Sequence, residues 1–526
     1  MAVGRIALVF FEVVILSGLI LITRCADYHD VFVAGNIYFS DADCYSRMTR
    51  VRLCAAHPGL IIRHHDFENY PNGTTPHTTA PLDYLILGLS ILLKPFSAHA
   101  VNLAGALISP FFGLASGWFL WWWSRMMKFR YRWTMLILFA ISPILVHGTE
   151  LGRPDHQSLL MLLVTIGICG EWSFQSKQST GWSVLAASAW GFALWVSTYE
   201  PLLLLVLLVV ISLAQDRRLL FTKTRRPGWI VFLTILAIAL AIERRLPSLS
   251  IFRSTELFKN WSQTIGELHF VSLRDPIWFH WTGYLIVVAP ILIWLGYRRQ
   301  NFGAADGRVL PIFVAGLLIA TFGLTIWQAR WGYFFISIFV VALPALLEST
   351  KSRTAVWFAF TLSVLPVLRD LDQRFWPNET TLAGQLERRN ESVQLRELAI
   401  LIRSTEIRPF LAPWWLSPEI AYWSEQPGVA GSSHESLDGI IDSARFFVAD
   451  KPRDTREILD RRKVFWVFAY DSDRVTTNSA ALLGLSRFPQ QPLSQTIDRA
   501  PSQAPLFLVF SGQNATAKLF RVVNKR

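Results

Sequence analysis

Three segments of the chain carry acidic side chains where an isolated charge is costly or unusual. The stretch LGRPDHQSLL lies between two long apolar runs, so Asp155 and His156 stand at the mouth of two expected membrane helices. Ionisable groups beside bilayer hydrocarbon are rare and usually functional. Glu267 has mostly uncharged neighbours in WSQTIGELHF, and Asp43 belongs to a D-x-D pair behind the first apolar run. Each segment therefore offers a carboxylate that could do chemistry.

Carboxylates contributed by separate segments are typical ligands of hard divalent cations such as Mg²⁺ and Mn²⁺. The alternative is that each acid is an ordinary solvated loop charge. Asp155 favours the metal site, because it lies in a very short loop at a helix end. The histidines give no indication of a zinc site, since neither a His-x₃-His nor a CxxC spacing occurs.

The elements that must position these acids are membrane helices. Of the 526 residues, 52% are hydrophobic and only 17% are charged, which is rare in a soluble protein of this size. Apolar runs recur over most of the chain, and we expect about eleven or more spans, with boundaries loose by a few residues. The runs are 6–23, 100–123, 132–147, 157–174, 181–197, 200–214, 228–243, 277–296, 308–327, 332–348 and 354–368. A further run, 82–94, could lie on the membrane as a helix.

The distribution of Lys and Arg predicts the orientation. The short loops 124–131, 216–228, 297–308 and 349–353 are basic and fall on one side, which the positive-inside rule makes cytoplasmic. The external side then receives the loops 24–99, 148–156 and 244–276, together with the C-terminal tail. The net charge of +12 is explained by this topology, and no basic face indicates nucleic-acid binding.

The chain is predicted to have two domains. Residues 1–370 form the transmembrane domain, and 371–526 form a small soluble external α/β domain, with strand-like runs KVFWVFAY and APLFLVF. Four cysteines are too few for a disulfide scaffold. Cys25, Cys44 and Cys54 lie in or near the first external loop, which leaves room for one bridge.

Several motifs occur together in a recognisable order. They are D-x-Y (Asp43-Cys44-Tyr45), G-R-P-D-H-Q after the third span, T-I-x-E (Thr264-Ile265-Gly266-Glu267) and the pair Trp414-Trp415. The combination resembles the catalytic-subunit family of oligosaccharyltransferases, which are membrane glycosyltransferases of the GT-C superfamily. The resemblance covers nearly the whole chain, and T-I-x-E in the expected external loop is its most specific element. Tyr70-Pro71-x-Gly73 also looks like a feature of the family's first loop.

The resemblance assigns roles to the acidic residues. Asp43 and Asp155 match the family's metal-binding aspartates, and Glu267 matches the glutamate that engages the acceptor amide and the metal site. Gln157 stands where the family often has an acid or His, and its amide carbonyl can also ligate a hard cation. Asp43 and Glu267 are thus the expected catalytic residues, and the expected cofactor is Mn²⁺ or Mg²⁺.

The resemblance also assigns binding roles and reveals one departure. Arg330 matches an arginine that holds the phosphate of the lipid-linked donor, and Trp414 and Trp415 match the pair that cradles the acceptor hydroxyl. An aromatic anchor at the membrane interface is the other reading of that pair. The family's W-W-D-Y-G is W-W-L-S-P here, and Leu416 cannot accept a hydrogen bond. A pocket without its acceptor should discriminate less well for the Ser or Thr hydroxyl of the sequon.

We therefore expect an enzyme that moves a glycan from a polyprenyl-(pyro)phosphate donor to protein, in particular to Asn. One alternative keeps the fold and donor but uses a lipid, a glycan or a hydroxyl group as acceptor. A transporter is the other, although it should place its polar residues within the spans. The expected location is the plasma (inner) membrane of a prokaryote, with the active site on the external or periplasmic face. The length is compatible with a single-subunit enzyme.

Overall fold

The computed structural model describes residues 2–245, 255–300, 309–348, 350, 352–487 and 490–523. The chain forms two compact units, each assembled from separate segments. We call the first the helical unit; it comprises Met1–His29, Gly105–Arg244 and Phe270–Glu379. We call the second the mixed unit; it comprises Asp30–Ala104, Arg245–His269 and Thr380–Arg526. Part of the predicted basic loop, 301–308, lies outside the described residues.

The helical unit contains the long apolar helices. They are α1 (Ala2–Arg24), α5 (Ala100–Met126, whose first turn belongs to the mixed unit), α6 (Arg132–Ile141), α7 (Pro143–His147), α8 (His156–Lys177), α9 (Thr180–Val196), α10 (Tyr199–Asp216), α11 (Arg226–Glu243), α14 (Leu285–Gln300), α15 (Ile312–Trp327) and α16 (Gly332–Glu348). Shorter helices are η1 (Arg217–Leu220), α13 (Ile277–Thr282), η4 (Ala329–Trp331), α17 (Arg353–Ser363) and α18 (Leu365–Phe375), while α2 (Tyr28–Val31) links the two units.

Each predicted apolar run overlaps with helix in the described part of the chain. Among the residues that the structure describes, five stretches are long and apolar enough to cross a membrane: Ile6–Arg24, Ala100–Met126, His156–Lys177, Arg226–Glu243 and Ala329–Glu348. The helices α17 and α18 form a sixth candidate, bent by 47°. The run 132–147 divides into α6 and α7, because Pro143 cannot donate the backbone hydrogen bond that would continue α6. Membrane crossing by about eleven spans stays a prediction.

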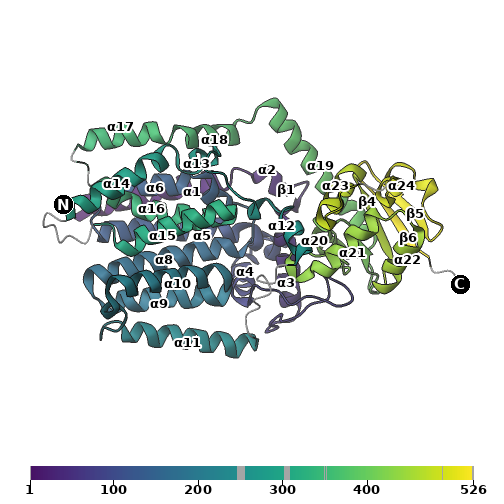
Figure 1. Cartoon of the computed structure of the whole chain (residues 1–526), viewed down its shortest axis with the longest axis horizontal. Coiled ribbons are helices and arrows are strands. Elements are labelled where there is room, and N and C mark those ends of the chain that lie inside the picture. The colour runs from purple at the N-terminus through teal and green to yellow at the C-terminus, as the bar shows by residue number, and fades with distance from the viewer. Residues whose placement is uncertain are drawn as a thin grey trace. The chain divides into compact units, whose positions relative to one another are not determined.

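Small residues allow the helices of this unit to approach closely. A Cβ added at Gly170 of α8 would lie 3.1 Å from Ala186 of α9, and one added at Gly191 of α9 would lie 3.1 Å from Ile235 of α11. Close backbone approach at small residues is the usual way in which membrane helices pack. Accordingly, α8, α9 and α11 lie side by side (Figure 1). The helices α8 and α16 are buried over most of their length and form the core of the unit.

The mixed unit contains a four-stranded sheet with helices around it. The strand order is β3-β4-β6-β5, with β3 parallel to β4 and the other pairs antiparallel. Its strands are β3 (Phe410–Leu411), β4 (Trp466–Tyr470), β5 (Leu508–Gln513) and β6 (Ala517–Val522). The short strands β1 (Phe32–Val33) and β2 (Asn36–Ile37) form a separate antiparallel pair. The helices are α3 (Ala42–Ala56), α4 (Ala80–Leu93), α12 (Glu256–Ser262), η3 (Gly266–Leu268), α19 (Glu379–Leu401), α20 (Ser417–Ser424), η5 (His434–Ser436), α21 (Leu437–Val448), α22 (Pro452–Arg461), α23 (Ser472–Leu483), α24 (Leu493–Arg499) and η6 (Pro501–Gln503).

The predicted α/β character of the C-terminal segment agrees with this unit, since KVFWVFAY contains β4 and APLFLVF leads into β5. Its external location stays a prediction. The bridge that the sequence left room for is absent: all four cysteines are free thiols. Cys44 and Cys54 lie ten positions apart on the same helix, α3, which separates them by about 15 Å at 1.5 Å per residue. A disulfide needs Cα atoms within about 7 Å.

Candidate active site

Asp155 is fixed at the start of α8. Its backbone is extended at the N-cap position, and its side chain accepts no capping hydrogen bond from the helix. Its Oδ1 instead lies 2.6 Å from Nδ1 of His156, and the residue is 9% exposed. Ser158 donates from its Oγ to the carbonyl of Asp155 at 2.7 Å. The positive end of the helix macrodipole favours a negative charge at this position.

The loop before Asp155 is held by its backbone. Leu151 donates to the carbonyl of Arg24, and Gly152 to that of Ala106, both at 2.9 Å. Gly152 has a φ of 76°, a left-handed conformation that favours glycine. The short loop before α8 is therefore held by backbone hydrogen bonds on the side that leads to Asp155.

Arg153 ties this loop to the beginning of α16. Its Nη1 lies 3.1 Å from Nε2 of His147, whose Nδ1 lies 2.7 Å from the hydroxyl of Tyr333. Tyr333 follows Arg330 by less than one helical turn. The structure thus brings the loop of Asp155 and the segment of Arg330 to the same end of the helical unit.

Arg330 has a buried partner. Its Nη2 is ion-paired with Oε1 of Glu200, whose residue is only 1% exposed. Ser197 donates to the other carboxylate oxygen of Glu200 at 3.3 Å, and the guanidinium of Arg330 lies 5.9 Å from the centre of the Tyr199 ring. Sequence reasoning missed Glu200, although an acid followed by the apolar run PLLLLVLLVV was a usable signal.

The donor groups of the helical unit suit a hard cation. Asp155 occupies the N-cap position of α8 and Gln157 lies in its first turn, so a carboxylate and an amide oxygen stand two positions apart, and both residues are buried. Oxygen donors of this kind match Mg²⁺ or Mn²⁺. Nδ1 of the His156 imidazole already contacts the Asp155 carboxylate.

Asp43 lies on the first turn of α3 in the mixed unit. Its neighbour Asp41 is the N-cap of that helix and accepts from the backbone N–H of Cys44 at 2.9 Å. The two acids of the D-x-D pair therefore differ: Asp41 stabilises the helix, while Asp43 is exposed. Tyr45 points inward, and its hydroxyl donates to Oε1 of Glu419 at 3.2 Å.

This contact attaches the helix of Asp43 to α20, which follows the Trp pair. Arg52 of α3 also donates to the carbonyl of Tyr422 at 2.8 Å, and the rings of Tyr45 and Tyr422 lie 5.3 Å apart. Burial raises the pKa of Glu419 to about 7, and the hydrogen bond from Tyr45 opposes that rise only in part. Glu419 is a second buried acid that sequence reasoning missed.

Glu267 lies in the short helix η3 and is partly exposed. The segment before it is anchored by Trp261, which is 4% exposed within a cluster of buried apolar residues. Ile265 packs against that same cluster, and Thr264 donates from both its backbone N–H and its hydroxyl to the carbonyl of Trp261. The T-I-x-E turn is thus a supported structure.

Trp414 and Trp415 have different surroundings. Their rings lie 5.8 Å apart and nearly perpendicular, and Trp414 packs edge-on against Trp261 at 6.2 Å. The guanidinium of Arg474 lies 5.7 Å from the Trp415 ring. The hydrocarbon side chain of Leu416 offers no hydrogen-bond acceptor. The hydroxyl of the next residue, Ser417, donates to the backbone carbonyls of Ala412 and Pro413.

The predicted site residues are shared between the units. Asp155, Gln157 and Arg330 belong to the helical unit, and Asp43, Glu267 and the Trp pair belong to the mixed unit. Within the mixed unit, the D-x-Y helix and the T-I-x-E turn both pack on the segment around α20. Convergence of all four oxygen ligands on one ion stays a prediction.

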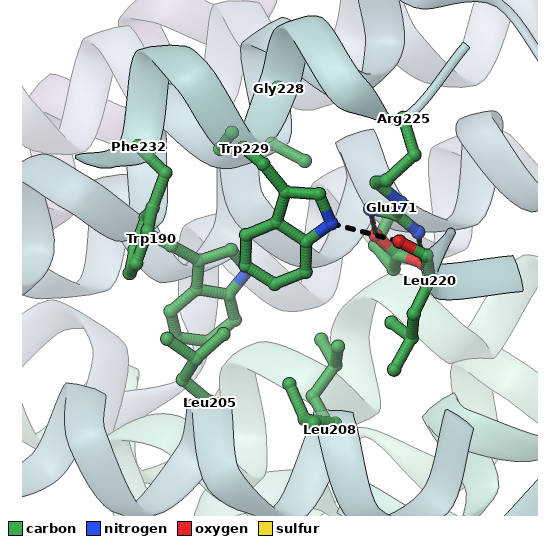
Figure 2. A pocket seen from close by; sticks show the side chains of 12 residues that line it. Glu171, Trp190, Leu205, Leu208, Leu220, Arg225, Gly228, Trp229 and Phe232 are labelled. Atoms are coloured by element: carbon green, nitrogen blue, oxygen red, sulfur yellow. Dashed lines mark hydrogen bonds and ion pairs between the residues drawn. The ribbon is translucent and has the colours of Figure 1, made fainter. Parts of the chain in front are cut away.

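A cavity of about 40 Å³ in the helical unit lies beside Glu171 of α8. The side chains that line it are drawn in Figure 2. Trp190, Trp229 and Phe232 line it, as do Arg225 and Glu171, which form an ion pair of 2.5 Å. Glu171 is near the end of α8, whereas Asp155 is at its start, about 24 Å away at 1.5 Å per residue. This apolar cavity is therefore separate from the candidate site.

Comparison with known proteins identifies solved structures of similar fold. No family model and no curated protein matches the sequence. Among solved structures, the archaeal oligosaccharyltransferase AglB from Archaeoglobus fulgidus, in complex with an inhibitory peptide and a dolichol-phosphate, is 14% identical with a TM-score of 0.67 over 89% of this chain and 70% of that chain. ArnT from Cupriavidus metallidurans, bound to undecaprenyl phosphate, is 12% identical with a TM-score of 0.57 over 99% and 98% of the two chains.

The arabinofuranosyltransferase AftD from Mycobacteria is 14% identical with a TM-score of 0.55, over 98% of this chain and 40% of that chain. These matches have low sequence identity and extend along nearly the whole of this chain. The predicted GT-C fold, the fold of membrane glycosyltransferases, is thereby confirmed.

Proposed function

We propose that the protein is a metal-dependent membrane glycosyltransferase that moves a glycan from a polyprenyl-(pyro)phosphate donor to Asn of a protein acceptor. The observation that carries the proposal is the buried carboxylate of Asp155, held at the start of an apolar helix in a chain with the GT-C fold. Asp155 occupies the N-cap position of α8 but makes no capping hydrogen bond to it, so its carboxylate does not serve as an ordinary helix cap.

The helical unit provides the groups for the donor. A bound Mg²⁺ or Mn²⁺ would supply Lewis-acid stabilisation of the phosphate as it leaves. Asp155 and Gln157 would hold that ion with oxygen ligands. Arg330 would hold the distal phosphate charge, and the ion pair with Glu200 would keep its guanidinium in place.

The mixed unit provides the groups for the acceptor. The nitrogen of the acceptor amide forms a bond to the anomeric carbon, the bond between that carbon and the phosphate oxygen breaks, and the amide loses one proton. An amide nitrogen is a poor nucleophile because its lone pair is delocalised. Asp43 and Glu267 would accept hydrogen bonds from the amide N–H groups and so offset that delocalisation, and one of them would receive the proton.

Recognition of the acceptor should be loose at the second residue after Asn. Trp414 and Trp415 would contact this residue, but Leu416 supplies no hydrogen-bond acceptor for a hydroxyl group. The reaction belongs on the external face of a prokaryotic plasma membrane, where the lipid-linked donor meets secreted polypeptides. A lipid, a glycan or a hydroxyl acceptor is the alternative that the experiment below distinguishes.

The test is transfer by the purified full-length protein in detergent, with a lipid-linked glycan as donor and a fluorescent Asn-x-Thr peptide as acceptor. We expect a mass increase at Asn that requires Mn²⁺ or Mg²⁺ and disappears in Asp43→Asn and Glu267→Gln. Asp66→Asn, an exposed acid in the same loop as Asp43, is the matched control and should keep full activity. Consumption of the donor without peptide product would favour another acceptor, and no consumption at all would contradict the proposal.

A further inference from the structure

Two histidines from distant parts of the chain meet one glutamate in the mixed unit. Nδ1 of His77 lies 2.8 Å from Oε1 of Glu435, and Nε2 of His434 lies 3.3 Å from the same oxygen. One donor atom from each of the three side chains lies within 4.8 Å of the other two. The centres of the two imidazole rings are 5.3 Å apart. We propose that these three residues bind a zinc ion.

The segment that carries His77 is fixed from outside the cluster. Arg245 donates to the carbonyl of Pro76 at 2.6 Å and to that of Thr78 at 3.0 Å, so its guanidinium holds the backbone on both sides of His77. The hydroxyl of Thr78 in turn accepts from Arg50 at 3.0 Å. A ligand on a segment held in this way loses little conformational freedom when a metal binds.

The segment that carries the other two ligands is joined to the same loop. The hydroxyls of Thr74 and Ser436 lie 3.0 Å apart in the interior, one residue beyond Glu435. The ring of Phe258 packs edge-on against His434 at 6.2 Å. The three proposed ligands therefore come from two segments that are already joined by a hydrogen bond next to the cluster.

The donor set indicates the metal. Two imidazoles and one carboxylate are a common zinc set, with bonds of about 2.0–2.2 Å to nitrogen and oxygen and one position left for water. The side chains of Glu435 and His434 are 7% and 12% exposed, while that of His77 is 33% exposed. The open side at His77 is where a water ligand would be placed.

This site differs from the one proposed for catalysis. Two of its three ligands are nitrogens, which suit zinc, whereas Asp43, Asp155, Gln157 and Glu267 offer only oxygens. A zinc ion here would cross-link the first external loop to residues 434–435 without taking part in transfer. The inference therefore stands or falls separately from the proposed function.

The experiment counts zinc on the full-length protein in detergent. Every variant carries Asp155→Asn, so that the catalytic metal does not contribute to the count. The protein is treated with a chelator, reloaded with Zn²⁺ and passed through a desalting column before elemental mass spectrometry. We expect one equivalent of zinc in the Asp155→Asn parent and in His57→Ala, which removes an exposed histidine at the end of α3.

The ligand variants decide the matter. We expect His434→Ala and Glu435→Gln to lose the equivalent of zinc. Their affinity for zinc should fall at least about 100-fold, since even changes outside the ligand set cost about 10–100-fold in metal affinity. His434→Cys supplies another zinc ligand and should retain it. Zinc should also raise the Tm of the parent but not that of Glu435→Gln, a variant of nearly unchanged shape. A parent that binds no zinc, or ligand variants that bind as well as the parent, would show only an ion pair between His77 and Glu435.

Discussion

The rings of Trp261 and Trp414 meet edge-on, with their centres 6.2 Å apart and their planes inclined by 64°. Trp261 belongs to the segment that ends in Glu267, and Trp414 opens the Trp pair next to α20. Ile265 packs against the same apolar cluster, two residues before Glu267. The first tryptophan of the pair therefore supports the turn that carries a proposed catalytic carboxylate, in addition to any contact with an acceptor.

Replacing Trp414 by Ala should loosen that turn. Removal of a fully buried aromatic side chain costs about 3–5 kcal/mol of stability. Trp414 is only partly buried, so its removal should cost less than that, and the loss falls on the support of Glu267. We expect faster hydrogen exchange over residues 262–268 and a lower kcat for transfer, whereas Trp414→Phe should preserve both. Trp376→Ala, at a side chain that is 73% exposed, is the control. Unchanged exchange at 262–268 in Trp414→Ala would refute the supporting role.

The ion pair between Arg330 and Glu200 allows a test that separates stability from function. Arg330→Gln leaves the carboxylate of Glu200 buried without its charge partner, which should cost about 3–5 kcal/mol. Combining it with Glu200→Gln removes the stranded charge, so the Tm should return toward the wild-type value. The double variant should nevertheless keep a raised KM for the lipid-linked donor. Recovery of donor affinity together with Tm would show that Arg330 is only structural.

Leu416→Asp should restore discrimination at the second residue after Asn. The new carboxylate could accept a hydrogen bond from a Ser or Thr hydroxyl, an interaction that an Ala peptide cannot make. We expect the ratio of kcat/KM for Asn-x-Thr over Asn-x-Ala peptides to rise at least about 10-fold. Leu416→Asn, which also carries an acceptor but no charge, should give a smaller rise. An unchanged ratio would mean that residue 416 does not face the acceptor.

The buried carboxyl of Glu419 predicts a dependence of stability on pH. Its pKa is raised to about 7 from an ordinary value of 4.5, because burial disfavours the charged form. The folded protein thus keeps a proton that the unfolded chain releases, and stability should fall as pH rises from about 4.5 to about 7 and then level off. For this one group the total loss is about 3 kcal/mol at most.

Glu419→Gln should remove that part of the dependence, and its Tm should change less between pH 5 and pH 8 than that of the wild type. Glu68, whose pKa burial also raises to about 7, remains in both proteins, so the difference between the two curves isolates Glu419. Glu425→Gln changes an acid with a 61% exposed side chain and should follow the wild-type curve. Parallel curves for Glu419→Gln and the wild type would contradict the assignment.

Local patterns in the sequence were sufficient to predict several elements. Long apolar runs predicted the helices, because a helix satisfies the backbone hydrogen bonds of such a run within the segment itself. The run KVFWVFAY predicted β4. The cost of a charge near hydrocarbon identified Asp155 before its place at the start of α8 was known. In each case the signal lies within about twenty consecutive residues.

Contacts between distant segments could not be predicted in this way. Tyr45 and Glu419 form a buried hydrogen bond, and His77 meets His434, yet neither pair has a characteristic spacing. The absence of a His-x₃-His motif said nothing about ligands supplied by two separate segments. Similarly, nothing in the D-x-D pattern distinguished Asp41, which caps α3, from the exposed Asp43.

The central claim is that this chain transfers a lipid-linked glycan to asparagine with the help of Asp155. The most direct measurement is intact-glycopeptide mass spectrometry of envelope proteins from the source cell and from a strain that lacks the gene. The deletion strain is complemented with wild type, Asp155→Asn or Asp66→Asn. We predict Asn-linked glycopeptides with wild type and Asp66→Asn, and none with the deletion or Asp155→Asn. Glycopeptides that persist in the deletion strain while lipid or surface glycans change would contradict the account.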